Sequence, residues 1–440
     1  LRLIVPFFVE TGDKIKIEKI ILDKPYINAI VLKNGKANWD IMKPSEDTTG
    51  KKDSSESNFK MALKQFKIND GIIKYRDDTL HFAMKMVNVN NSLKGDFTAD
   101  NFILSTLTTI NELSIIYENV PYINKAKADI SADMDVNMKE FKFEFTKAEA
   151  KINELLLSMA GYFSMPDTSI NMDFELNSTK TDFKNILSMV PYIYANSFKD
   201  VQTRGNATLS AKVKGKYNAV EMPSFNIKLL VGNAMFKYPS LPAAVENINI
   251  NLNITNPDGV ADNTVINIPL FHFEILKNPF DFKLISKTPV SNPSIDVVLT
   301  GKLNFNDIKK VLPLEKGTEL NGILETDIKA KGDMKMIDKG RYEDFDLKGF
   351  FRLSDMRYFS KDIKMPLDIK EMVMTFNPKN VTLSSFVGTY GKQDFNVKGK
   401  IDNFIAYILR NETIKGSVDI RSKYININEL MPTETNSESN

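Results

Sequence analysis

The chain of 440 residues has no cysteine and only two histidines, His81 and His272. Without cysteine it forms no disulfide, no zinc–thiolate site and no thiol nucleophile. The two histidines lie far apart in the sequence, which leaves little material for histidine-based catalysis or metal binding. A Gly-x-Ser-x-Gly elbow, a phosphate-binding loop and a dinucleotide-binding fingerprint are also missing. The sequence therefore predicts a protein that is not an enzyme and that holds no cofactor or metal.

An excess of charge of one sign and a long apolar run are missing as well. Lys and Arg number 58 and Asp and Glu 56, whereas a nucleic-acid-binding protein typically carries a basic face. We therefore expect no nucleic-acid partner. No apolar run reaches the ~18–20 residues that a membrane-spanning helix needs, and the nearest, residues 1–9, is interrupted by Pro6. Because the chain does not begin with Met, we expect that a preceding segment has been removed.

Apolar and polar residues alternate along much of the chain after residue 59. Apolar side chains occupy every second position in 128–138, 170–176 and 248–254, with Asp, Asn, Ser or Glu between them. This period of two predicts antiparallel strands with one apolar face and one solvated face. The near-continuous apolar runs of a buried parallel sheet are scarce. We predict a mainly β fold: an elongated, curled antiparallel sheet with an open groove.

A repeated unit organises the second half of the chain. The segment GNATLSAKVKG ends at Gly215, and its counterpart GILETDIKAKG ends 117 residues later, at Gly332. Asn-Pro at 256–257 recurs at 377–378, and GSVDI at Gly416 begins a partial third copy. Short crossover helices are predicted at 182–190, 306–312 and 403–409. A fixed period is typical of units that stack on their neighbours, and we place the copies at about 169–290, 291–398 and 399–430 in a sheet over 59–430.

The N-terminal segment 11–42 contains two strand-like runs on either side of Pro25, an Asn34-Gly35 turn, and Asn38-Trp39-Asp40. Asn-Gly between such runs is among the strongest hairpin signals. We predict a β-ribbon cap over 1–43, in which Trp39 is expected to pack and not to recognise a ligand. Residues 44–58 have no large apolar side chain and predict a flexible loop, and 431–440 predict a disordered tail.

The pattern of this ribbon resembles the N-terminal signature of the AsmA family, membrane-anchored β-rich proteins of the Gram-negative envelope. The positions that carry the resemblance are Pro25, Gly35, Asn38, Trp39 and Asp40. It implies a periplasmic protein that is anchored to the inner membrane by an N-terminal helix missing from this chain. It also implies a role in outer-membrane biogenesis, in which a β-groove similar to that of TamB-like proteins passes phospholipids or other acyl lipids towards the outer membrane. The Ser/Lys-rich insert after residue 42 departs from the pattern.

The apolar stripes supply the candidate lipid-binding residues. Met and Phe form adaptable apolar surfaces that can accept acyl chains, although the same residues also suit an ordinary core. The candidates are Ile130, Met134, Val136, Met138, Phe141, Phe143, Phe145, Met172, Phe174, Ile248, Ile250, Leu252, Ile254, Met372, Met374 and Phe376.

Two alternatives stay open at this point. Serial closed β-sandwiches fit the alternation as well as an open groove does, because both have one apolar face per strand. The alternative function is that of a periplasmic scaffold that assists outer-membrane assembly proteins, with exposed sheet edges pairing with strands of other chains.

Two acidic groups imitate metal sites without completing one. Asp133-x-Asp135-x-Asn137 begins like a calcium loop, but Met138 stands where the turn needs glycine. Asp77 and Asp78, near His81, are expected in a turn, and His272 is expected as a hydrogen-bonded strand residue.

Overall fold

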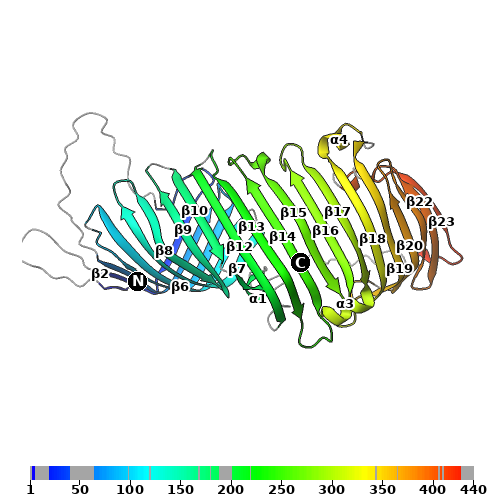
Figure 1. The fold of residues 1–440 in the computed structure, drawn as a ribbon, viewed down its shortest axis with the longest axis horizontal. Coiled ribbons are helices and arrows are strands. Elements are labelled where there is room, and N and C mark those ends of the chain that lie inside the picture. Colours follow the sequence, from blue (N-terminus) through cyan, green and yellow to red (C-terminus); the bar gives the residue numbers. More distant parts are fainter. Residues whose placement is uncertain are drawn as a thin grey trace, which may run out of the picture. The chain divides into compact units, whose positions relative to one another are not determined.

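The structure is a computed structural model that describes residues 2–4, 19–39, 64–97, 99–117, 120–166, 169–178, 180–187, 201–218, 220–341, 344–363, 365–404, 407–408 and 411–427. It is mainly β, with 68% strand and 7% helix, and its sheet is open and does not close on itself (Figure 1). The prediction of a long, open, mainly antiparallel sheet with a few short helices is confirmed. The predicted loop 44–58 and tail 431–440 lie outside the described residues.

The chain divides into two compact units. Unit 1 comprises Leu1–Lys199, Asn206–Leu229 and Thr255–Val260, and unit 2 comprises Asp200–Gly205, Leu230–Ile254 and Ala261–Asn440. The elements of unit 1 are β1 (Arg2–Ile4), β2 (Lys19–Asp23), β3 (Tyr26–Val31), β4 (Gln65–Asp77), β5 (Phe82–Lys94), β6 (Asn101–Tyr117), β7 (Val120–Asn137), β8 (Lys142–Ile152), β9 (Leu155–Ser164), β10 (Ile170–Ser178), β11 (Thr181–Asp182) and α1 (Phe183–Leu187). Residues of β12 (Gln202–Tyr217), β13 (Ser224–Lys237) and β14 (Val245–Asn256) belong to both units.

The other elements belong to unit 2. They are η1 (Ala261–Asn263), β15 (Val265–Ile275), β16 (Asn278–Lys287), β17 (Ser294–Asn304), α3 (Phe305–Val311), β18 (Glu319–Asp333), α4 (Met334–Asp338), β19 (Asp346–Phe359), β20 (Leu367–Phe376), β21 (Val381–Tyr390), β22 (Gln393–Ile401) and β23 (Gly416–Arg421). Each strand from β15 to β23 pairs antiparallel with the next.

In unit 1, strands β4 to β10 follow one another in antiparallel order, and β10 pairs with β12. The N-terminal strands depart from this rule. β2 and β3 both run parallel to β4, one beside each half of it. They therefore lie end to end beside β4 and do not pair with each other as a ribbon, and β1 pairs antiparallel with β2. The Asn34-Gly35 turn is present, because Gly35 has φ +77° and its amide donates to Leu32 O at 2.8 Å.

The predicted helices are present within the described residues. The side chain of Asn304 accepts a hydrogen bond from the amide of Asn306 and caps the start of α3, which ends at Val311 ahead of Pro313. α1 covers Phe183–Leu187 of the predicted 182–190, and 188–190 lie outside the described residues. In the third segment the amide of Tyr407 donates to Asn403 O at 2.9 Å, a helical bond.

The repeat seen in the sequence has matching local geometry. Gly205 in β12 and Gly322 in β18 both have positive φ, +102° and +111°. A Cβ at either position would lie 2.4 Å from the Cα of Ala234 or 2.6 Å from the Cα of Met356. The Asn-Pro turns also agree, since the side chains of Asn256 and Asn377 each accept hydrogen bonds from amides two and three residues ahead. Both copies thus place glycine where two strands approach closely.

An asparagine side chain holds a left-handed strand residue in both units. In unit 1 the left-handed residues Asp70 of β4 and Asn88 of β5 lie at the two β-bulges beside Gly71, and Asn90 Oδ1 accepts from the amide of Asp70 at 3.1 Å. In unit 2 Asn249 Oδ1 accepts from the amide of left-handed Asn233 at 3.0 Å. Because a bulge bends its strand and increases the local twist, the positions in unit 1 curve the sheet.

The close approach at Gly322 gives a stability prediction. Gly322→Ala should lower the free energy of unfolding by about 2 kcal/mol, because alanine is strained at positive φ and its Cβ meets the backbone of β19. Gly232→Ala is the matched control, since no atom lies within 4 Å of its added Cβ and it should shift stability by less than about 1 kcal/mol. Urea unfolding measures both, and equal midpoints for the two variants would contradict the role given to Gly322.

Candidate functional site

One face of the unit 1 sheet is apolar. Along β7, Ala128, Ala132, Met134 and Val136 are buried, while Asp135 between them is exposed. The predicted alternation is therefore confirmed on this strand. The buried cluster around them is Leu104, Ala132, Met134, Val136 and Ala148. It is contiguous across β6, β7 and β8, so the apolar side chains form a surface that extends over several strands.

Aromatic rings extend this surface. Phe143 of β8 stacks on Phe163 of β9 at 4.8 Å between ring centroids. Phe174 of β10 lies 5.6 Å from Phe145 and 6.2 Å from Phe163. All four rings are only half-buried. Phe163 was missed in the sequence, although Leu155, Leu157, Met159, Gly161 and Phe163 repeat with a period of two along β9.

The unit 1 sheet curls towards this apolar face. Six strands, β5 to β10, lie between β4 and β12, so a flat sheet would separate the two by about 34 Å. Burial raises the pKa of Tyr217 of β12, and so do the charges of Asp77 of β4 and Tyr117 of β6. Because the electrostatic effect of one charged group on another fades over about 10 Å, Tyr217 lies near Asp77 and Tyr117. The side chain of Tyr217 lies on the same face of the sheet as Phe174, because Tyr217 pairs with Ile170 in the register that also pairs Phe174 with Val213. The face that turns inward is therefore the apolar one.

A tyrosine–carboxylate pair lies where the sheet curls back. The Tyr75 hydroxyl donates to Asp77 Oδ2 at 3.2 Å, and the Tyr75 ring lies 6.0 Å from that of Phe82. Burial favours a raised pKa for the Asp77 carboxyl, but hydrogen bonds from Thr79, Leu80 and Tyr75 outweigh it and hold the pKa below its usual value. Burial and Asp77 raise the pKa of Tyr75. Asp77 closes the predicted turn by accepting from the amides of Thr79 and Leu80.

Unit 2 also has an apolar face. Phe376 of β20 is buried with Val381, Leu347, Phe345 and Ile337, and Met374 packs against them. Met372 is opposite Leu353 and Phe386. On β14, Ile248 is buried, and Ile250, Leu252 and Ile254 are half-buried at alternate positions.

The candidate residues of unit 1 lie together with one exception. Ile130, Met134, Val136, Met138, Phe143, Phe145, Met172 and Phe174 belong to the apolar stripes of β7, β8 and β10 or to the turn that joins β7 and β8. Phe141 does not continue the stripe. It lies in that turn with φ +46° and is 47% exposed, because β8 begins only at Lys142. The tight turn uses the residue that the alternation had assigned to the strand.

The residues of the N-terminal signature serve mainly local structure. Pro25 is fully buried beside Gly71 of β4, and its carbonyl accepts from the amide of Ile72 at 2.8 Å. Asn38 bridges back to β3, since its Oδ1 accepts from the amide of Ile30 at 2.9 Å. Trp39 is 49% exposed, and its ring lies 6.3 Å from that of Tyr75, so whether it packs or recognises a ligand stays a prediction. Asp40 lies outside the described residues.

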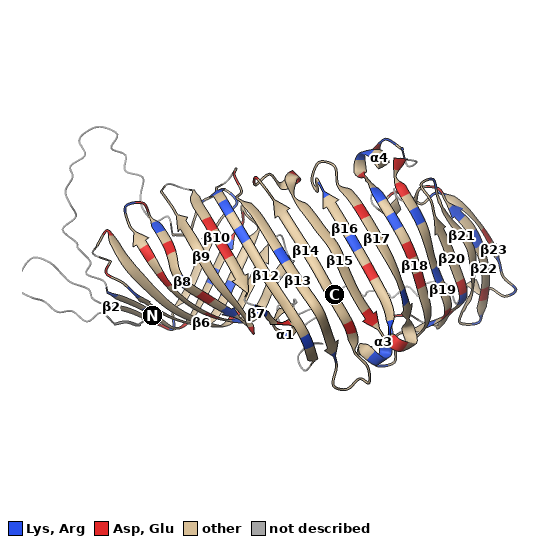
Figure 2. Ribbon diagram, in the orientation of Figure 1, with Lys and Arg blue, Asp and Glu red and all other residues tan. Residues whose placement is uncertain are grey.

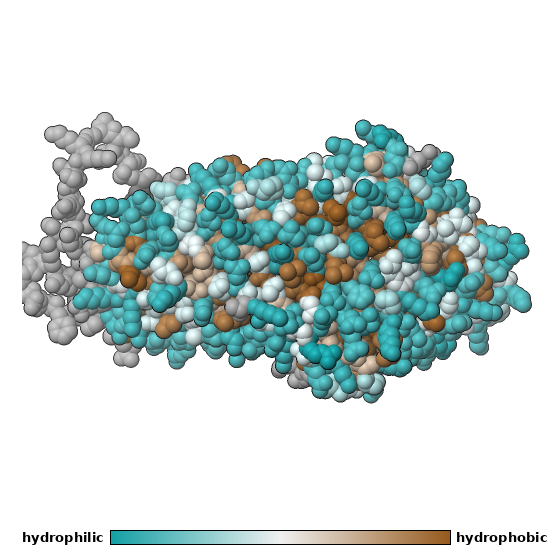
Figure 3. All heavy atoms as spheres, in the orientation of Figure 1, coloured by the Kyte–Doolittle hydropathy of each residue, from teal (hydrophilic) through white to brown (hydrophobic). Residues whose placement is uncertain are grey.

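The opposite, polar face carries rows of ion pairs. Glu325 of β18 accepts from Lys302 at 2.8 Å and pairs with Arg352 at 3.5 Å, so the row crosses β17, β18 and β19 (Figure 2). The Lys302 hydrogen bond is the main reason that the pKa of Glu325 is lowered. Side chains on the face shown in Figure 3 are mostly hydrophilic, with an apolar area over β15 to β17. Exposed ion pairs contribute little to stability individually, so their main effect is to keep this face hydrophilic.

Within the described part of the chain, no group of three or more His, Asp or Glu side chains could hold a metal ion. Asp133 accepts from the Ser105 hydroxyl at 2.6 Å, and His272 Nδ1 lies 2.8 Å from Asp281 on the next strand. His272 is thus the hydrogen-bonded strand residue that was predicted. Among the same residues no helix is long and apolar enough to span a membrane.

No protein-family model matches the chain, and no curated protein or solved structure is significantly similar to it. The resemblance of residues 11–42 to AsmA proteins therefore stays a prediction.

The hydrogen bonds to Asp77 give a pH prediction. Because the folded-state pKa is lowered, Asp77 stabilises the fold above its unfolded pKa of about 4 and loses this effect as the pH falls through the folded value. Asp77→Asn should therefore reduce the loss of stability between pH 7 and about pH 3, as measured by urea unfolding. Asp129→Asn, at an exposed position of β7, should leave the acid dependence close to that of the unaltered chain. An unchanged acid slope in Asp77→Asn would contradict the argument.

Proposed function

We propose that the chain is a non-enzymatic envelope protein that shields phospholipid acyl chains on the apolar faces of its sheet and lets them pass along it. The observation that carries the proposal is the concave apolar face of unit 1. Every described strand belongs to one sheet, so within that part of the chain no second sheet covers this face. Its rings at Phe143, Phe145, Phe163 and Phe174 stay half-exposed, where a packed core would bury them.

The energetics favour acyl chains over water on such a surface. Each methylene removed from water contributes about 0.8 kcal/mol, so a chain of ~16 carbons gains on the order of 10 kcal/mol before the entropy of ordering is subtracted. Rings and thioethers adapt to chains of different length. The stripe from Ile130 to Met138 holds no charged side chain, because Asp133 and Asp135 alternate onto the other face. Without a polar anchor, neighbouring positions hold a chain about equally well, which favours sliding.

The setting of the proposal comes from the AsmA resemblance of the N-terminal segment. It adds a periplasmic location, an association with the inner membrane of a Gram-negative bacterium, and transfer of phospholipids towards the outer membrane.

The direct test is to purify the chain and identify what elutes with it by lipid mass spectrometry. We expect bound phospholipid. If no phospholipid is recovered, even after photo-cross-linking to acyl probes, the proposal is wrong. Phe163→Gln combined with Phe174→Gln should lower the recovered lipid roughly tenfold, since the apolar contact area falls and polar groups take its place. Ala160→Gln is the control, because Ala160 is exposed on the opposite face of β9.

Far-UV circular dichroism and urea midpoints of these variants separate lost binding from lost folding. Intact folding with unchanged lipid in the double Phe variant would contradict the placement of the lipid on this face. Gross unfolding would instead assign the rings to a closed core.

A second candidate function is the capture of strands from outer-membrane assembly proteins. It is favoured by β23, which pairs with β22 on one side and exposes all six of its residues, Val418 and Ile420 by 61% and 62%. Edge strands of this kind can accept a further strand by backbone hydrogen bonds. Ile420→Pro removes one backbone donor and should abolish such capture while leaving lipid recovery unchanged.

A further inference from the structure

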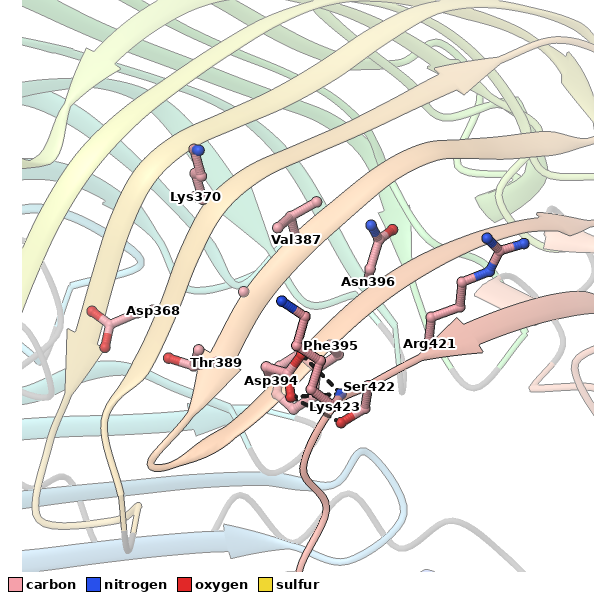
Figure 4. A pocket seen from close by; sticks show the side chains of 11 residues that line it. Asp368, Lys370, Val387, Thr389, Asp394, Phe395, Asn396, Arg421, Ser422 and Lys423 are labelled. Atoms are coloured by element: carbon pink, nitrogen blue, oxygen red, sulfur yellow. Dashed lines mark hydrogen bonds between the residues drawn. The ribbon is translucent and has the colours of Figure 1, made fainter.

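A cavity of about 550 Å³ opens at the last strands of unit 2, separate from the apolar cluster there. Its lining residues come from four successive strands and the segment that follows them (Figure 4). They are Asp368 and Lys370 of β20, Val387, Gly388 and Thr389 of β21, Asp394, Phe395 and Asn396 of β22, Arg421 of β23, and Ser422 and Lys423. None of them belongs to the cluster around Phe376.

The acidic side chains of this cavity are already occupied. Both oxygens of Asp368 accept from Arg357 Nη1, at 2.8 and 2.9 Å. Asp394 Oδ1 accepts from the amides of Tyr424 and Lys423, both at 2.9 Å, and from the Ser422 hydroxyl at 3.1 Å. These bonds, the one from the Tyr424 amide foremost, lower the pKa of Asp394. The charge of Asp368 is thus paired with a guanidinium, whereas Asp394 keeps its charge and directs it at the backbone amides of the segment after β23.

The cationic side chains of the cavity are less engaged. Arg421 reaches only its strand neighbour Asp419, at 3.2 Å in an exposed pair. For the ammonium groups of Lys370 and Lys423, no hydrogen bond or ion pair joins them to any described residue. Lys370 comes from β20 and Lys423 from the segment after β23, and Thr389 and Asn396 belong to the two strands that lie between β20 and β23 in the sheet (Figure 4).

The donors of this cavity thus outnumber its free acceptors. Two ammonium groups, a guanidinium, the Asn396 amide and the Thr389 hydroxyl surround a space several times larger than a phosphate group. Hydrogen bonds from charged donors to a phosphate or carboxylate are about twice as strong as those between neutral groups. A doubly charged oxyanion uses several donors at once, which a single exposed lysine cannot provide.

We propose that this cavity binds a phosphate group, either of a soluble phosphate ester or of a lipid headgroup. Lys370 and Lys423 supply the charge, Arg421 adds a planar pair of donors, and Asn396 and Thr389 supply neutral donors. The site does not depend on the acyl-chain function proposed above, because it shares no residue with the apolar face of unit 2.

The test uses the full chain and inorganic phosphate, titrated by isothermal calorimetry at low salt. Saturable binding is expected that weakens as salt is raised. Lys370→Gln combined with Lys423→Gln should weaken it roughly tenfold or more, since the two unpaired charges are removed. Lys398→Gln is the matched control, because Lys398 is exposed on β22 beside the cavity and does not line it, and it should leave the affinity within about twofold.

A parallel titration with a short-chain phosphatidylglycerol distinguishes the two sources of phosphate. Tighter binding than inorganic phosphate, lost in the double Lys variant, assigns the site to a lipid headgroup, and equal binding assigns it to soluble phosphate. Absence of saturable phosphate binding by the unaltered chain overturns the proposal. Equal affinity of the double variant and the unaltered chain also overturns it, provided that circular dichroism shows both to be folded. Neither of the two results that overturn the phosphate site would change the amount of lipid recovered from the purified chain. The phosphate proposal and the acyl-chain proposal can therefore fail separately.

Discussion

A strand that is apolar on one side must have something against that side, and this requirement governs unit 1. Its strands present a continuous apolar face, yet all described strands belong to the same sheet. The face is partly screened by curvature instead, which brings Tyr217 of β12 into electrostatic range of Asp77 of β4. Bulges such as the pair at Asp70 and Asn88 supply the bending. Curvature therefore does here what a second sheet does in a sandwich, but it leaves the rings half-exposed.

This incomplete cover links the fold to the proposed function. A fully buried core has no apolar surface left to cover, whereas half-exposed rings are stabilised further when another apolar molecule covers them. The two faces of β7 differ in polarity, since its carboxylates lie on the side away from Met134 and Val136. The cavity at Lys370 and Lys423 is a different kind of site, because cationic side chains line it. The hydrophobic and the ionic recognition that we propose would therefore use separate parts of the chain.

Local features were predictable from the sequence, and remote ones were not. The period of two fixed the strands and placed Met134, Phe145 and Phe174 on the apolar face, and capping by Asn304 with Pro313 beyond it located α3. The parallel course of β2 and β3 along β4 had no local signal, because pairing partners lie far along the chain. Phe141 was misplaced since a left-handed turn residue looks like one more strand position. The cavity of Lys370 and Lys423 could not be predicted, because its cations are brought together only by the order and register of four strands.

The asparagine side chains that hold left-handed strand residues depend on the covalent integrity of an amide. Asn249 Oδ1 accepts from the amide of Asn233, while its Nδ2 donates to the carbonyl of Asn247 at 2.8 Å. Deamidation to aspartate would replace that donor by a carboxylate oxygen, which can only accept. The oxygen would then face the carbonyl of Asn247 and repel it, while the bond to Asn233 stayed possible. Spontaneous chemical ageing at a single side chain would therefore remove one of the two hydrogen bonds by which Asn249 holds these strand positions.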